Sequence, residues 1–87
     1  MTTLSDLIRE RFEDVETSGG VVRVASRPFQ ELAPYFDAEP AKQAAGLIST
    51  CVVDPAMSAE DANKLPPDIV MVLVEACLRV NGLNAPD

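Results

Sequence analysis

The sequence predicts a mainly α-helical fold: a small helical domain of about four to five helices with a short N-terminal β-hairpin. Three observations lead to this fold class. The apolar run 69–80 has Pro66-Pro67 in front of it and Asn81-Gly82 behind it, which are typical helix boundaries. The run 37–53 places small and apolar residues at helical spacing. Ser18-Gly19-Gly20 separates two groups of β-branched residues, as expected for a tight hairpin.

The chain has 87 residues, which is enough for one domain with a modest core. A core of this size gives marginal stability unless a disulfide, a metal or self-association adds to it. The chain has no histidine and only two cysteines, so we expect self-association. The expected organisation of residues 1–87 is an N-terminal helix (1–13), a hairpin (14–25), a helical core (26–83) and a tail (84–87).

The N-terminal helix is amphipathic, because Leu4, Leu7 and Ile8 recur at helical spacing and Ser5 or Thr3 can cap its start. Its other side is charged and is expected to face solvent. The hairpin follows. Its glycines could in principle cradle a phosphate, but the lysine and the spacing of a P-loop are missing.

A turn of helix is expected over 26–33, where Pro34 should end it, and Tyr35-Phe36 then forms an aromatic joint. The second main helix, 37–53, has Pro40 in its first turn and should end at Asp54-Pro55. A short helix begins at Ser58, with Asp61 placed for a capping box. The segment 54–65 does not fit a calcium-binding EF-hand loop, because it lacks the glycine and the final glutamate.

The central helix is expected over 66–82. Asp68 and Arg79 lie where they complement the helix dipole. The β-branched run 69–74 is also compatible with a buried strand, but the length of the segment and the prolines favour a helix. Glu75 interrupts the run, so it is too short in apolar length to cross a bilayer.

The formal net charge of −7 argues against binding to nucleic acid and to anionic membranes, and favours a neutral or basic protein partner. The absence of histidine excludes catalytic Ser–His and Cys–His pairs. Cys51 and Cys77 could form one bridge, but both lie in apolar helical patterns, which favours buried free thiols. We expect no enzyme, no metal and no cofactor. The N-terminus lacks the pattern of a signal peptide, so a cytoplasmic location is expected.

The C-terminal half resembles the tail assembly chaperones of long-tailed bacteriophages and prophages. The resemblance covers about residues 44–83 and rests on three stretches: Leu47-Ile48-Ser49-Thr50-Cys51-Val52-Val53-Asp54, Ser58-Ala59-Glu60-Asp61-Ala62-Asn63-Lys64-Leu65-Pro66, and Leu78-Arg79-Val80-Asn81-Gly82-Leu83. It implies a mainly helical, non-catalytic, self-associating protein in the host cytoplasm. Its partners would be the tape measure protein and the tail tube protein, and a longer frameshifted form occurs in some members.

Such a chaperone needs an apolar surface that accepts amphipathic helices. The sequence hypothesis places this surface on one face of the central helix, with Leu47/Ile48 and the aromatic joint beside it. The candidate residues for client binding or self-association are Tyr35, Phe36, Leu47, Ile48, Ile69, Val70, Leu73, Val74 and Cys77. The alternative is a small acidic regulator or inhibitor, antitoxin-like or a DNA mimic, that binds a basic protein through its carboxylates.

Overall fold

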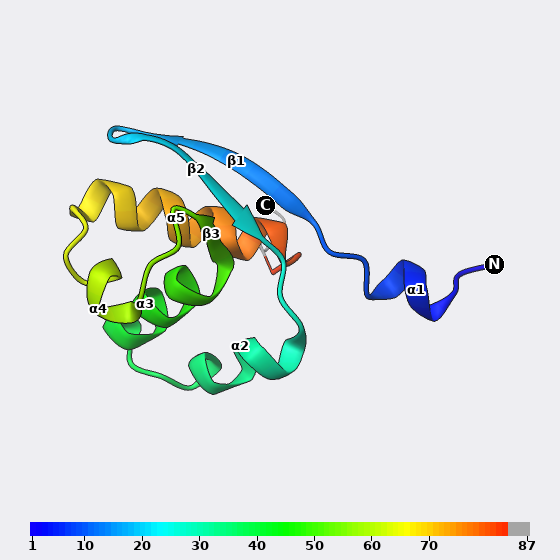
Figure 1. Ribbon diagram of the computed structural model, residues 1–87. Helices are drawn as coiled ribbons and strands as arrows, with labels where there is room; N and C mark the ends of the chain where they lie inside the picture. Colours follow the sequence, from blue (N-terminus) through cyan, green and yellow to red (C-terminus); the bar gives the residue numbers. More distant parts are fainter. Residues whose placement is uncertain (84–87) are drawn as a thin grey trace.

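Residues 1–83 are described by the computed structural model, which is a small α/β domain that is 51% helical and 19% strand. Five helices and a three-stranded antiparallel sheet alternate along the chain (Figure 1). In order they are α1 (Leu4–Leu7), β1 (Phe12–Thr17), β2 (Gly20–Ala25), α2 (Phe29–Phe36), α3 (Pro40–Cys51), β3 (Val52–Asp54), α4 (Ala59–Ala62) and α5 (Pro67–Val80).

The expectation of a mainly α fold is therefore wrong, and β3 is the main reason. The sequence predicts one helix over 37–53, but the helix ends at Cys51 and Val52 is extended, with φ −77° and ψ 121°. Val52 pairs with Val24 of β2, and Asp54 pairs with Arg23. Two consecutive valines fit the pleated surface of a sheet better than the last turn of a helix. The available edge of β2 thus converts the end of the predicted helix into a strand.

The hairpin is longer than expected at its N-terminal end. β1 pairs with β2 from Phe12↔Ala25 to Thr17↔Gly20, and Gly20 takes the positive φ (127°) that the turn requires. The sequence predicts a helix over 1–13, but the ladder includes Phe12 and Glu13. Because Phe12 is already in a strand, the N-terminal helix is reduced to the four residues of α1.

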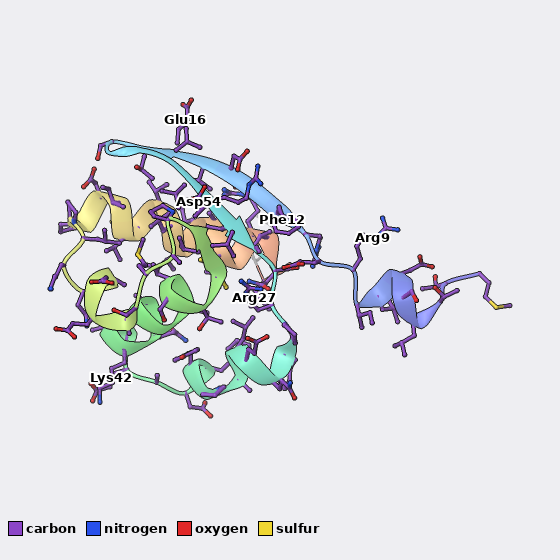
Figure 2. All side chains as sticks on the ribbon, viewed as in Figure 1. Arg9, Phe12, Glu16, Arg27, Lys42 and Asp54 are labelled. Atoms are coloured by element: carbon purple, nitrogen blue, oxygen red, sulfur yellow. The ribbon has the colours of Figure 1, made fainter. Side chains whose placement is uncertain are left out.

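The core lies between the hairpin and α3, with α5 packed against both (Figure 1). The alternating residues Val15, Val22 and Val24 are buried, whereas Glu16 points away from the body (Figure 2). The largest side chains with almost no exposed surface are Ile48, Leu73, Val24, Cys51 and Cys77. The helix α5 has the boundaries that its flanking residues indicate, with Pro66 at its N-cap and Asn81 at its C-cap.

Two short helices complete the fold. In α2 the predicted stop at Pro34 is wrong, because the helix contains Pro34 and continues to Phe36. The helix α4 starts at the predicted capping box, in which the Ser58 hydroxyl accepts a hydrogen bond from the Asp61 N–H at 3.1 Å. The expected tail at 84–87 lies outside the described residues. Among residues 1–83, no helix has both the length and the apolar character needed to cross a membrane.

Candidate binding surface

The structure places most of the predicted site residues inside the protein. Leu47, Ile48, Leu73 and Cys77 are buried in the core between α3 and α5. Tyr35, Ile69, Val70 and Val74 are half-buried, and Phe36 alone is classed as exposed. The face of α5 that the sequence hypothesis offered to a partner is therefore largely occupied by the chain itself.

Tyr35 holds α2 against α3. A Cβ atom added to Gly46 would lie 2.2 Å from Tyr35 Cε1 and 2.3 Å from Cδ1, so the ring lies directly over the glycine. The Gln43 side-chain amide donates a hydrogen bond to the Tyr35 carbonyl at 3.0 Å. These contacts fix the orientation of α2 and with it the positions of its aromatic side chains.

Two other elements each carry more than one large apolar side chain that reaches solvent, whereas Phe12, Val21, Met71 and Leu83 are exposed singly elsewhere. The first is the arm, which we define as residues 1–11. Its Leu4, Leu7 and Ile8 are 72%, 73% and 72% exposed. The second is the α2 aromatic pair, Phe29 and Phe36, which are 73% and 41% exposed and whose ring centroids lie 5.8 Å apart. Figure 1 shows α1 standing away from the rest of the molecule.

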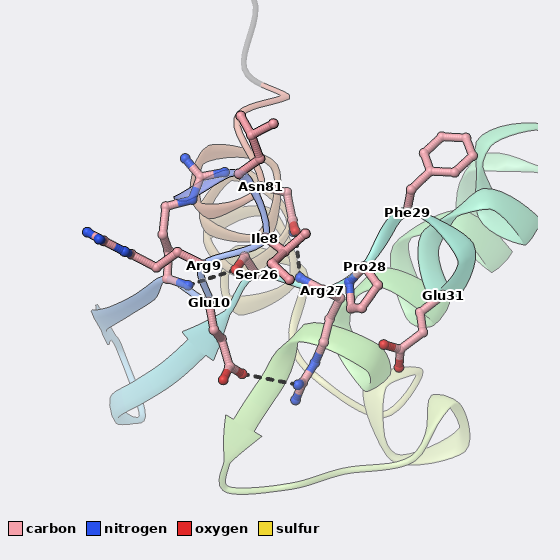
Figure 3. A pocket seen from close by; sticks show the side chains of 11 residues that line it. Ile8, Arg9, Glu10, Ser26, Arg27, Pro28, Phe29, Glu31 and Asn81 are labelled. Atoms are coloured by element: carbon pink, nitrogen blue, oxygen red, sulfur yellow. Dashed lines mark hydrogen bonds and ion pairs between the residues drawn. The ribbon is translucent and has the colours of Figure 1, made fainter. Parts of the chain in front are cut away.

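A cleft of about 690 Å³ lies between these two elements. One side is formed by the arm residues 7–11, and the other by the segment 26–29 and Glu31 at the start of α2, with Asn81 between them. Figure 3 shows Phe29 and Glu31 on one side of the cleft and Arg9 and Glu10 on the other. An apolar ring at the rim and charged groups in the wall suit an amphipathic ligand.

Arg27 lies in the cleft wall and ties its parts together (Figure 3). Its backbone N–H donates to Asn81 Oδ1 at 2.8 Å, and its Nε donates to the carbonyl oxygen of Thr50 at 2.9 Å. Its Nη1 lies 3.4 Å from Glu10 Oε1. The base of the arm is held independently, because Arg11 N–H donates to Ser26 Oγ at 2.8 Å. The wall of the cleft around Arg27 is therefore held by several contacts, although the arm itself projects from the body of the molecule.

Sequence reasoning included Phe36 but missed Phe29 and the arm. An 87-residue chain with only four aromatic residues is expected to bury them, but Phe29 is 73% exposed. The arm could have been recognised from two features taken together. Leu4, Leu7 and Ile8 are apolar at helical spacing, and the strand that follows leaves no room for a longer helix. A helix of one turn cannot bury three such side chains by itself.

The two cysteines are fully buried and free. A hydrogen bond with Cys77 lowers the pKa of Cys51 to about 7, and Asn81 Nδ2 adds a second contact to the Cys51 sulfur at 3.4 Å. The same contact with Cys51 raises the pKa of Cys77, and burial raises it further. Both sulfurs are screened from solvent, so they contribute to packing and offer no accessible nucleophile.

Within residues 1–83, no group of three or more His, Cys, Asp or Glu side chains is arranged to hold a metal ion. Comparisons with protein-family models, with curated proteins and with solved structures found no match for this chain. The assignment of a function therefore rests on the chain's own residues.

Proposed function

We propose that this protein is a non-catalytic tail assembly chaperone of the phage type. It binds an amphipathic helix of the tape measure protein in the host cytoplasm and delivers it to the assembling tail tube. The proposed binding site for this helix, which we call the seat, is the α2 aromatic pair and the cleft beside it. The observation that carries this proposal is the exposure of Phe29 at the rim of a cleft of about 690 Å³, with the exposed ring of Phe36 beside it at a centroid distance of 5.8 Å. The resemblance of residues 44–83 to such chaperones supports the same function.

The α2 side of the seat suits a helix with one apolar and one basic face. Two neighbouring phenylalanine rings can pack against leucine and alanine side chains without selecting one sequence. The charged residues of segment 28–41 are Glu31, Asp37 and Glu39, whereas Arg9, Arg11 and Arg27 line the rest of the cleft together with Glu10. A basic face on the client would complement these carboxylates and speed the encounter.

A synthetic amphipathic peptide with a leucine face and a lysine face provides the test. We expect Phe29→Ser/Phe36→Ser to weaken its binding at least about tenfold, as measured by fluorescence anisotropy, because aromatic anchors dominate such contacts. Met71→Ser is the matched control, because Met71 is 70% exposed on α5 and does not line the cleft. It should leave the affinity within about twofold. Equal losses in both variants would contradict the assignment of the seat.

Salt separates this function from the alternative of an acidic regulator. Binding through apolar contacts should persist in about 0.5 M NaCl, whereas binding through carboxylates alone should collapse. Several carboxylates already have partners in the chain, since Glu13 pairs with Arg79 and Asp14 with Arg23. Co-expression with the tape measure protein encoded in the same genome gives the second test, with the soluble yield of that protein as the readout.

A further inference from the structure

We infer that the seat selects a client helix with opposite charges on the two sides of its apolar stripe, acidic toward the arm and basic toward α2. We call these two sides the flanks of the helix. The inference rests on the proposed function, because it specifies the charge pattern and the direction of the helix that the seat binds. The observation behind it is that the two walls of the cleft carry charges of opposite sign.

The charge of the cleft differs from that of the whole chain. The chain has seven basic and fourteen acidic residues, which gives a formal net charge of −7. Three of the seven basic residues line the cleft, but only two of the fourteen acidic residues do. The apolar part of the lining comes from both walls, with Leu7 and Ile8 on the arm and Phe29 on α2. The arrangement of charges in the cleft, and not the overall acidity of the chain, therefore decides which helix fits.

The arm wall is basic. Arg9 Nη2 lies 3.9 Å from Asp6 Oδ1, and the two side chains are 75% and 51% exposed. Contacts between such exposed groups are weak, so Arg9 remains available to a ligand. The Arg11 guanidinium lies beside Gly82 and forms no ion pair within residues 1–83. Asp6 does not line the cleft, so this wall presents two guanidinium groups to a ligand.

The opposite wall is acidic, and the centre of the cleft is neutral. Arg27 Nη1 lies 3.4 Å from Glu10 Oε1, so these two charges balance each other. Glu31 lies with Phe29 on the side of the cleft opposite Arg9 (Figure 3). In the part of the chain that the structure describes, Glu31 forms no ion pair. Its carboxylate is therefore free to meet a basic group on a ligand.

Opposite walls fix the direction of a bound helix. The two flanks have fixed positions relative to the helix axis, so a helix that binds in the reverse direction exchanges them. Charges beside an apolar seam set partner choice and orientation in paired helices in the same way. A helix with one acidic and one basic flank matches both walls in one direction and meets like charges in the other. A helix with two basic flanks meets the arm guanidinium groups in either direction.

The test compares two peptides of equal length with the same leucine stripe. One carries lysine on both flanks, and the other carries lysine on one flank and glutamate on the other. In about 0.15 M NaCl, attraction to the net charge of the chain is largely screened. We expect the lysine/glutamate peptide to bind at least about threefold more tightly, as measured by fluorescence anisotropy. The overall acidity of the chain favours the all-lysine peptide, so it cannot produce this order.

Charge reversal on the arm provides the variant. Arg9→Glu/Arg11→Glu should reverse the order of the two affinities. If this variant does not fold, Arg9→Glu alone decides, and it should reduce the preference to less than about twofold. Lys64→Glu is the matched control, because it changes a basic to an acidic residue at an exposed position that does not line the cleft. It should keep the preference of the wild type.

A nitroxide label at one end of the lysine/glutamate peptide reports the direction of the helix. Broadening of backbone amide signals in the NMR spectrum should be confined to one end of the cleft. Exchanging the two flanks in the peptide sequence should move the broadening to the other end with little change in affinity. Broadening at both ends with a single label would contradict a fixed direction.

The outcomes separate this inference from the proposed function. Equal affinities for the two peptides at the lower salt concentration would overturn the inference, and so would a preference that Arg9→Glu leaves unchanged. If binding then still depends on Phe29 and Phe36, the proposed function stands without the charge selection. If neither peptide binds, the proposed function fails and the inference fails with it.

Discussion

Replacing Gly46 with alanine should destabilise the protein, although alanine is the better helix former. Gly46 lies inside α3, where alanine is favoured over glycine by about 1 kcal/mol. Against this gain stands the ring of Tyr35. Three of its atoms would lie 2.2, 2.3 and 2.8 Å from the new Cβ, which is closer than such atoms can approach.

The clash should outweigh the gain in helix propensity. Forcing an extra methyl group into a packed contact typically costs about 1–3 kcal/mol. The tyrosine is half-buried and can swing outward, but it then loses its packing on α3 and its hold on α2. The net effect should be a loss of about 1–2 kcal/mol. For a domain of this size that corresponds to a fall of roughly 4–16 °C in the melting temperature.

The measurement is urea unfolding followed by circular dichroism, with a double-mutant cycle as the control. Once Tyr35→Ala has removed the ring, Gly46→Ala should stabilise the protein by up to about 1 kcal/mol, because only the helix propensity remains. The same substitution thus changes sign between the two backgrounds. A stabilising effect of Gly46→Ala in the wild-type background would refute the close packing of the ring on α3. Loss of the packing should also weaken peptide binding, because α2 carries Phe29 and Phe36.

Two further predictions concern stability. Leu73→Ala should lower the free energy of unfolding by about 3 kcal/mol, because the side chain is fully buried. Met71→Ala, on the exposed side of the same helix, should change it by less than about 0.5 kcal/mol. Comparable losses in the two variants would contradict the orientation of α5. The hydrogen bond from Arg79 lowers the pKa of Glu13 below its usual value of 4.5. The ionised Glu13 carboxylate therefore contributes its full stabilisation of the fold above pH 4.5. This stabilisation is lost as the pH falls through the lowered pKa of Glu13. Glu13→Gln should therefore cost at most about 1 kcal/mol at pH 7, and the urea midpoints of variant and wild type should converge once the pH is below the lowered pKa of Glu13.

The elements that sequence analysis located correctly are those with local signals. The helix α5 lies between Pro66 and Asn81 because proline fits the first turn and the residues at 81–82 fit the last. The α4 start follows from one serine and one aspartate three residues apart. Such signals act over a few residues and do not require a knowledge of the rest of the fold.

The elements that it missed depend on partners far away in the chain. Val52 and Val53 are compatible with a helix end or a strand, and the pairing of Val52 with Val24 decides between them. Residues 28 positions apart meet only after α3 has placed its end beside β2. The same limit applies to the candidate surface: Tyr35 and Phe36 are neighbours in the sequence, yet one packs on Gly46 and the other reaches solvent.

The position of the exposed apolar surface has a consequence for how this chain is stabilised. The apolar sequence of the central helix predicts a partner surface for it. The structure covers α5 with the hairpin on one side and α3 on the other, so that Leu73, Ala76, Cys77 and Val80 are buried within one chain. The exposed apolar side chains that a partner could cover are therefore those of the arm and of the α2 aromatic pair. The arm and the exposed rings of α2 lie outside the core, although Leu32 of α2 is buried in it, so a client can cover them without unfolding the domain.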